Sequence, residues 1–143
     1  MKHFIFFCTL FFWSIGDAQN GLPKTAVQDF FKAFHIQDTS TMRSFFHVSA
    51  SIQTVTSNVD GPVVREESVN ELIRGIGGIP NEIRFEERIK RFKVRSDGKI
   101  AQVWTPYEFW INGKKSHSGV NSFVLVKVGD DWKIIHLIDT RKK

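Results

Sequence analysis

The sequence predicts an α+β domain whose helices pack on one face of a strongly bent antiparallel sheet. Three observations support this fold class: an apolar stripe with helical spacing after residue 22, a capped helix in mid-chain, and four long β-prone runs joined by hairpin turns after residue 82. Strands of such length twist and bend. We therefore expect a cone-shaped cavity between the first helix and the sheet.

The N-terminal residues have the pattern of a secretory signal peptide. Met1-Lys2-His3 carries positive charge, residues 4–15 are almost entirely apolar, and Gly16-Asp17-Ala18 offers the small residues that a signal peptidase reads. The apolar run is shorter than the ~20 residues of a membrane-spanning helix. We therefore predict a signal peptide over 1–18, a domain over 19–143, and an exported protein, periplasmic or secreted, that has no stable membrane anchor after cleavage.

Cleavage would remove Cys8, the single cysteine of the chain. The mature domain then forms no disulfide and no thiolate metal site. No two histidines have HxH or HxxxH spacing, and neither a phosphate loop nor a GxSxG elbow is present. We expect no metal and no cofactor. The net charge is +5. In an exported protein we interpret its basic clusters as solvated sheet edges rather than as a nucleic-acid surface.

The first helical segment is predicted over 22–35, with Pro23 in its first turn. One face carries apolar residues at i, i+3, i+4 and i+7: Val27, Phe30, Phe31 and Phe34. His35 closes this helix, where a cation interacts favourably with the macrodipole. Asp38 or Thr39 caps a second short helix, and His47 is expected to end it.

Short strands are expected over 51–56 and 62–64. Ser68-Val69-Asn70-Glu71 is a capping box that opens a third helix, and Gly77-Gly78 ends it. The remaining chain predicts an antiparallel meander of four strands over 83–95, 100–111, 115–128 and 132–141. Their connectors, all typical of hairpins, are Asp97-Gly98, Asn112-Gly113 and Gly129-Asp130-Asp131.

The Asn112-Gly113 turn predicts which residues face each other across its hairpin. A two-residue loop places Glu108 opposite His117 and Trp104 opposite Asn121. On this interpretation one face carries polar groups and points into the cavity, together with Phe123, while the opposite face is a packed layer or a dimer face. The alternative for Glu108 and His117 is an exposed cross-strand pair near the hairpin tip.

The register of the last strand has two possibilities. A three-residue loop places Asp139 opposite Asn121 and Arg141 opposite Gly119. With a two-residue loop the partners on that face become Ile138 and His136, and His136 points inward beside Phe123. In the first case the arginine can hold an anionic ligand bidentately. Gly119 would leave space where a ligand or a backbone approaches.

The order of these elements resembles the nuclear transport factor 2-like superfamily, which includes SnoaL-like cyclases, ketosteroid isomerases and scytalone dehydratases. The resemblance covers the mature chain and rests on Phe30-Phe31-Lys32-Ala33-Phe34, the capped middle helix and the closing run from Gly129 to Ile135. It implies the cone-shaped fold and favours the first register of the last strand. Ketosteroid isomerases use a tyrosine on the opening helix, where this chain has phenylalanines, so that mechanism is not expected.

Three functions from different classes remain open. The preferred one is an exported domain that binds a small molecule, either anionic or polar-aromatic, between walls formed by Trp104 and Phe123. Its polar contacts would be His117, Asn121, Asp139 and Arg141. The second is a lyase or isomerase in which His117 is the general base, oriented by Glu108 or Asp139. The third is a structural homodimer without ligand, and we expect homodimer formation through the sheet for the binding domain as well.

Overall fold

The computed structural model describes residues 22–143, so the predicted signal peptide and Cys8 lie outside the described residues. In this range the chain forms ten elements: α1 (Pro23–His35), α2 (Thr39–Ser44), β1 (Phe46–Asn58), β2 (Gly61–Glu67), α3 (Val69–Gly77), β3 (Phe85–Ile89), β4 (Lys93–Ser96), β5 (Ile100–Ile111), β6 (Lys114–Val128) and β7 (Asp131–Thr140). Within the same range no helix combines the length and the apolar character needed to cross a bilayer.

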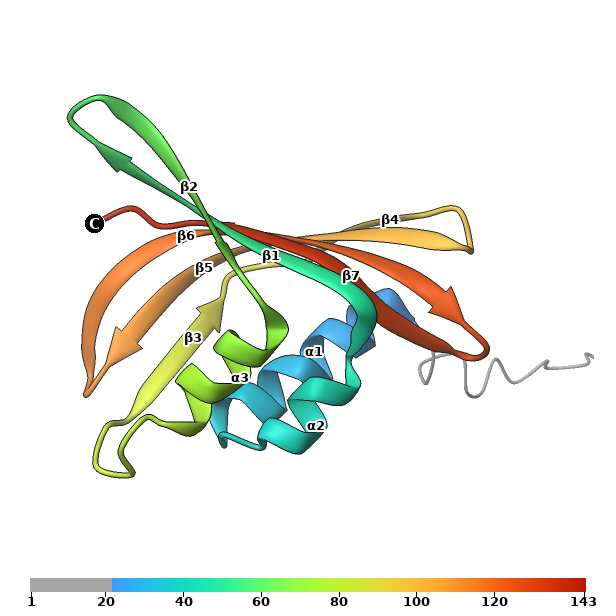
Figure 1. Cartoon of the computed structure of the whole chain (residues 1–143), viewed down its shortest axis with the longest axis horizontal. Helices are drawn as coiled ribbons and strands as arrows, with labels where there is room; N and C mark the ends of the chain where they lie inside the picture. The colour runs from blue at the N-terminus through green and yellow to red at the C-terminus, as the bar shows by residue number, and fades with distance from the viewer. Residues whose placement is uncertain (1–21) are drawn as a thin grey trace, which may run out of the picture.

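The strands form one sheet in the order β2-β1-β7-β6-β5-β3, with β4 also pairing with β5. The sheet bends strongly, and the helices lie together inside the bend (Figure 1). The predicted α+β cone is thus confirmed, with a larger sheet than the predicted meander, because β1 pairs in parallel with β7 and antiparallel with β2. Both early strands extend well beyond 51–56 and 62–64.

The predicted strand over 83–95 is divided into β3 and β4. Ile89 pairs with Tyr107 and Lys93 pairs with Trp104, so three residues stand opposite two on β5. One of those two is Pro106, which has no N–H to donate to a neighbouring strand. The ladder is therefore interrupted at the proline.

Local capping explains where the helices begin. The Asp38 side chain accepts a hydrogen bond from the Thr41 amide at the start of α2 (3.0 Å), and Ser68 and Glu71 form both bonds of the capping box of α3. The prediction that His47 ends the second helix is wrong, because the chain joins the sheet earlier. The Phe45 carbonyl accepts a bond from the Ile134 amide (2.7 Å), and β1 starts at the next residue.

The core lies between α1 and the middle of the sheet. The Phe30 ring has edge-to-face contacts with four other phenylalanine rings, those of Phe31, Phe45, Phe46 and Phe123. Each buried phenylalanine stabilises the fold by about 1.5–3 kcal/mol relative to an exposed one. This aromatic packing holds α1 beneath the sheet.

Candidate functional site

The β5–β6 hairpin begins as its turn predicts and then changes register. Asn112 and Gly113 both have positive φ (47° and 77°), and Trp110 pairs with Lys115. At Ser116 β6 carries one extra residue, so that Phe109 pairs with His117. A bulge of this kind shifts every later pair by one residue, which exchanges the faces on one of the two strands.

The bulge corrects two of the expected site residues. Thr105 lies opposite Asn121, where Trp104 was predicted, and Tyr107 lies opposite Gly119. Trp104 therefore lies on the convex face and is 40% exposed. The carboxylate of Glu108, on the same face, forms an ion pair with Lys90 (2.8 Å). The roles predicted for Trp104 as a pocket wall and for Glu108 as the partner of His117 are both wrong.

The register of β7 combines the two predicted alternatives. Val128 pairs with Asp131 across a two-residue loop, but Ile135 is bulged, and beyond it Asp139 pairs with Asn121. The second bulge thereby produces the alignment that a three-residue loop would have given. Asp139 and Arg141 consequently lie on the concave face beside Asn121.

The C-terminal segment is held over the pocket by backbone hydrogen bonds. Lys142 exchanges two bonds with Ser118 (2.8 and 2.9 Å), and the Arg141 amide donates to the Val55 carbonyl (3.0 Å). A Cβ atom at Gly119 would overlap the carbonyl oxygen of Thr140. The sequence predicted that either a ligand or a backbone segment approaches Gly119, and in the structure it is the backbone of Thr140. The close approach positions Arg141.

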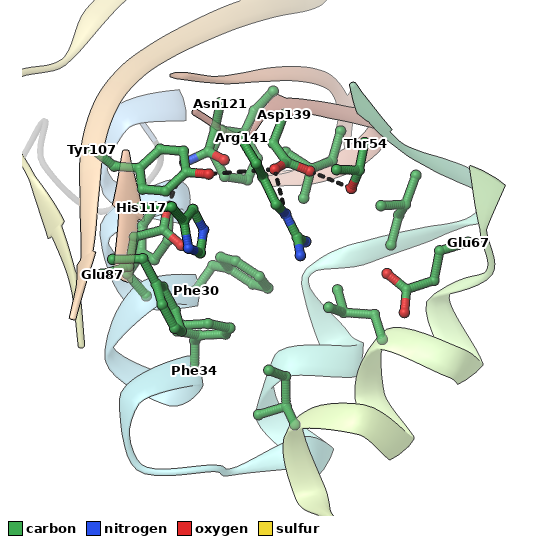
Figure 2. A pocket seen from close by; sticks show the side chains of 17 residues that line it. Phe30, Phe34, Thr54, Glu67, Glu87, Tyr107, His117, Asn121, Asp139 and Arg141 are labelled. Carbon is green, nitrogen blue, oxygen red and sulfur yellow. Dashed lines mark hydrogen bonds and ion pairs between the residues drawn. The ribbon is translucent and has the colours of Figure 1, made fainter. Parts of the chain in front are cut away.

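A cavity of about 190 Å³ lies between the helices and the concave face of the sheet. Its apolar lining comes from α1, α3 and the sheet: Phe30, Phe31, Phe34, Leu72, Ile76, Ile52, Phe109, Phe123 and Leu137. Most of the polar side chains lie on the sheet side, whereas Glu67 lies across the cavity, as Figure 2 shows. The sheet-side group consists of Glu87, Tyr107, His117, Asn121, Asp139 and Arg141. Five of the predicted site residues are thus brought together: His117, Asn121, Phe123, Asp139 and Arg141.

Asp139 is the centre of a hydrogen-bond network at the pocket wall. Its carboxylate accepts bonds from Thr54 Oγ1 (2.6 Å), from Arg141 Nε (3.1 Å) and, more weakly, from Tyr107 Oη (3.4 Å). Burial and the nearby charge of Asp139 raise the pKa of Tyr107, so its hydroxyl stays protonated. These contacts direct Asp139 toward Arg141 and Tyr107 and not toward His117.

The side chain of Glu87 is a second carboxyl group in the pocket, and the sequence analysis missed it. Its Oε1 accepts a bond from Asn121 Nδ2 (2.6 Å), which also donates to Thr105 Oγ1 (3.2 Å). Burial raises the pKa of Glu87 to about 7, and the charge of Asp139 adds to the rise, although the bond from Asn121 opposes it. At neutral pH this carboxyl group is therefore present in both protonation states.

A signal for Glu87 exists in the sequence. Glu87 alternates with Phe85 and Ile89, two apolar residues that face inward on the same strand. A carboxyl group between two inward-facing apolar residues indicates a buried acid.

His35 at the end of α1 contacts the same strand. The backbone amide of Glu87 donates to His35 Nε2 (3.0 Å), and burial lowers the pKa of His35. The predicted cationic role of His35 at the helix end is therefore wrong, since the ring acts as a neutral acceptor.

His117 is fixed by aromatic contacts. Its ring stacks on Phe109 with centroids 5.0 Å apart and meets Tyr107 edge-on at 5.8 Å. Its Nδ1 lies 3.2 Å from Ser116 Oγ. Burial and the positive charge of Arg141 lower the pKa of His117. The imidazole is thus mostly neutral at pH 7, and within residues 22–143 its Nε2 has no hydrogen-bond partner.

Arg141 supplies the hydrogen-bond donors at the mouth of the cavity. Its side chain is half exposed, and its Nε is paired with Asp139. Neither terminal nitrogen has a hydrogen-bond or ion-pair partner in the described part of the chain, and Figure 2 shows both directed into the pocket. An apolar cavity with a few convergent polar groups is typical of small-molecule sites.

Comparison with known proteins agrees with the fold. The model of the SnoaL-like domain family matches residues 24–138. No curated protein is significantly similar to the chain in sequence. Many solved structures are similar in fold.

Three of these structures illustrate how differently the proteins with this fold are described. A candidate dehydratase of the NTF2-like family from Streptomyces avermitilis has a TM-score of 0.63 and 16% identity, covering 84% of this chain and 93% of its own. A candidate scytalone dehydratase from Novosphingobium aromaticivorans has a TM-score of 0.63 and 10% identity, covering 84% and 81%. An NTF2-like protein of unknown function from Shewanella baltica has a TM-score of 0.58 and 16% identity, covering 82% and 89%.

At such low identity the likeness to these structures shows the shared fold and nothing about activity. The family match extends over most of the chain, from the first turn of α1 to residue 138 within β7. This chain belongs to the SnoaL-like domain family and has the NTF2-like fold.

Proposed function

We propose that this protein is an exported domain that binds a small molecule, with the apolar body of the ligand inside the cone and an anionic group at Arg141. Export rests on the signal peptide predicted from the sequence. The observation that carries the proposal is the largely apolar cavity with two unpaired guanidinium nitrogens of Arg141 at its mouth. A bidentate guanidinium suits carboxylates and other oxyanions.

The size of the cavity limits the body of the ligand. A protein cavity of roughly 150 Å³ holds benzene, so about 190 Å³ accommodates one ring with a short substituent. The aromatic lining, with Phe30, Phe34 and Phe123 among its residues, favours a flat, apolar group. Relatives in this family that bind or convert small molecules support the same interpretation.

Binding of phenylacetate, measured by isothermal titration calorimetry, tests the proposal. The Ile76→Trp variant fills the cavity and should abolish binding, whereas Ile36→Trp alters an exposed isoleucine (74% exposed) and should bind as the wild type does. Arg141→Gln should weaken binding by about tenfold, because hydrogen bonds to charged groups contribute about 1.5–3 kcal/mol. Unchanged binding by a folded Ile76→Trp variant would contradict the proposal.

A second candidate function is a lyase or isomerase reaction that depends on proton transfer. The specific observation in its favour is Glu87, whose pKa of about 7 suits a general acid or base near neutral pH. Glu87 lines an apolar cavity, and Asn121 holds one oxygen of its carboxyl group. Glu87 thereby joins His117, the base proposed from the sequence, as a candidate for the proton-transfer group.

Solvent deuterium exchange at the α-carbon of enolisable ketones, followed by NMR, distinguishes the two candidate bases. If Glu87 is the base, the rate rises through pH 7 as the carboxyl group ionises, Glu87→Gln abolishes it, and His117→Ala retains most of it. Loss of exchange in His117→Ala alone would assign the base to His117. No exchange with any ketone would leave ligand binding as the function.

A further inference from the structure

The cone cavity continues into an outer groove. This groove, of about 360 Å³, is lined by Thr54, Glu67 and Arg141, which also line the cone, and by residues of β1, β2 and α3: Thr56, Arg65, Glu66 and Glu71. Because three residues are shared, the two volumes meet at Arg141. The guanidinium of Arg141 therefore lies at the junction and not at the outer end of the available space.

The pairing of β1 with β2 directs Arg65 into this groove. Thr54 pairs with Arg65, and Ile52 pairs with Glu67. Directly paired residues project from the same face of a sheet, and both Thr54 and Ile52 line the cone. Arg65 and Glu67 therefore lie on the concave face. Figure 1 shows the β1–β2 hairpin extending past the helices, so the groove is open at this end.

The groove carries three carboxyl groups, those of Glu66, Glu67 and Glu71, and two guanidinium groups that still have hydrogen-bond donors to offer. Arg65 has no hydrogen-bond or ion-pair partner among residues 22–143, and the terminal nitrogens of Arg141 have none either. The neighbouring carboxylates are in use, because Glu66 accepts a bond from Gln53 (3.1 Å) and Glu71 accepts bonds from Ser68 (both 2.7 Å). Burial raises the pKa of Glu67, and the positive charge of Arg141 opposes this rise. Two open guanidinium groups on one face match an oxyanion.

We propose that the ligand is amphipathic and longer than the cone, with a ring in the cone and an oxyanion, carboxylate or phosphate, held between Arg141 and Arg65 in the outer groove. This inference rests on the proposed function and adds a second subsite to it. Ligand pockets usually measure about 300–1,000 Å³, and the cone alone, at about 190 Å³, falls short of that range. The groove supplies the missing volume.

The test is a series of calorimetric titrations with acids in which the chain between the ring and the anionic group becomes longer. The acids are phenylacetate, phenylbutyrate and phenylhexanoate, and phenylbutyl phosphate is added to compare a phosphate with a carboxylate. Wild-type affinity should increase with chain length. Arg65→Gln should weaken binding of the longer acids by about tenfold and leave phenylacetate unchanged. Thr56→Trp, which fills the groove, should have the same selective effect. Arg95→Gln is the matched control, since it removes an exposed arginine on β4. The phosphate arm shows which oxyanion binds more tightly.

The outcomes separate the two proposals. If Arg65→Gln and Thr56→Trp bind every acid as the wild type does while Ile76→Trp binds none, the cone is the site and the outer subsite is wrong. Wild-type affinity that does not rise with chain length also overturns the outer subsite. If no acid binds the wild type, or if Ile76→Trp binds them all, the proposed site in the cone and the proposed outer subsite are both wrong. Arg65 is exposed, so its variant should fold, and urea unfolding confirms this for each protein.

Discussion

At the scale of single residues, Glu87 shows how position in the fold changes the chemistry of a side chain. Its neighbour Glu86 is exposed and forms an ion pair with Arg88 (2.8 Å). Glu87, one residue later, faces the cavity, and burial raises its pKa to about 7. The folded state therefore binds the proton of Glu87 more tightly than the unfolded chain, where the pKa is near 4.5.

This difference predicts a pH-dependent stability. The contribution of Glu87 is fully present below about pH 4.5 and is lost as the pH rises through about 7. Glu87→Gln keeps an oxygen for Asn121 and removes the titration. At pH 8 we expect it to be more stable than the wild type by about 3 kcal/mol, and at pH 4.5 about equally stable. Urea unfolding at both pH values measures the difference, with Glu86→Gln as control; equal stabilities at pH 8 would refute the buried ionisation.

Gly119 is a second residue whose role depends on its surroundings. A methyl group there would collide with the Thr140 carbonyl oxygen, so Gly119→Ala should displace the segment that carries Arg141. We expect a loss of about 1–3 kcal/mol of stability together with weaker phenylacetate binding. Gly75→Ala is the control, because that glycine has open space around it. Urea unfolding and calorimetry measure both effects; wild-type values for Gly119→Ala would show that the backbones separate easily.

At the scale of elements, two bulges and one cap decide the shape of the site. The bulge at Ser116 chooses which residues of β5 face the cavity, and the bulge at Ile135 aligns Asp139 with Asn121. Helix α3 supplies the opposite wall with Leu72 and Ile76. Helix α3 is short and the two bulges are irregular, so their positions depend on packing against the neighbouring elements.

The cap of α3 allows a direct test of this dependence. Ser68→Ala removes the acceptor for the Glu71 amide and should cost about 1 kcal/mol of stability. Ser57→Ala, in the exposed β1–β2 hairpin, is the matched control and should change little. Thermal and urea unfolding measure both variants. If Ser68→Ala is as stable as the control, tertiary contacts alone hold α3 in place.

At the scale of the whole molecule, the convex face of the sheet is the surface for the predicted homodimer, which stays a prediction. Trp104 on this face is 40% exposed, and Trp110 lies on the same face under the guanidinium of Arg88 (4.1 Å). Exposed aromatic residues are enriched at protein–protein interfaces.

Sedimentation equilibrium tests the homodimer. If two sheets pack face to face, Trp104→Lys should convert the dimer to a monomer, because it places a charge in the centre of the interface. Ile36→Lys, on the helical side of the molecule, should leave the dimer intact. A wild-type protein that sediments as a monomer at all concentrations would exclude this mode of assembly.

The local signals in the sequence determined the framework of this protein. Three local signals depend on residues only a few positions apart: the apolar stripe of α1, the capping box at Ser68 and the Asn112-Gly113 turn. They can therefore be recognised from the sequence alone. With the order of elements, they determined the α+β cone and the resemblance to its family. They also placed Asn121, Phe123 and His117 on one face of β6, since alternation along a strand is a local property.

Only the tertiary structure determined which residues of the other strands lie beside that face of β6. The bulges at Ser116 and Ile135 and the pairing of β1 with β7 join segments far apart in the chain. No local pattern encodes them, because each depends on how strands distant in the sequence pack against one another and on where the sheet bends. The same bending turned Glu108 outward, brought Glu87 to Asn121, and carried Arg141 to the junction of the two cavities.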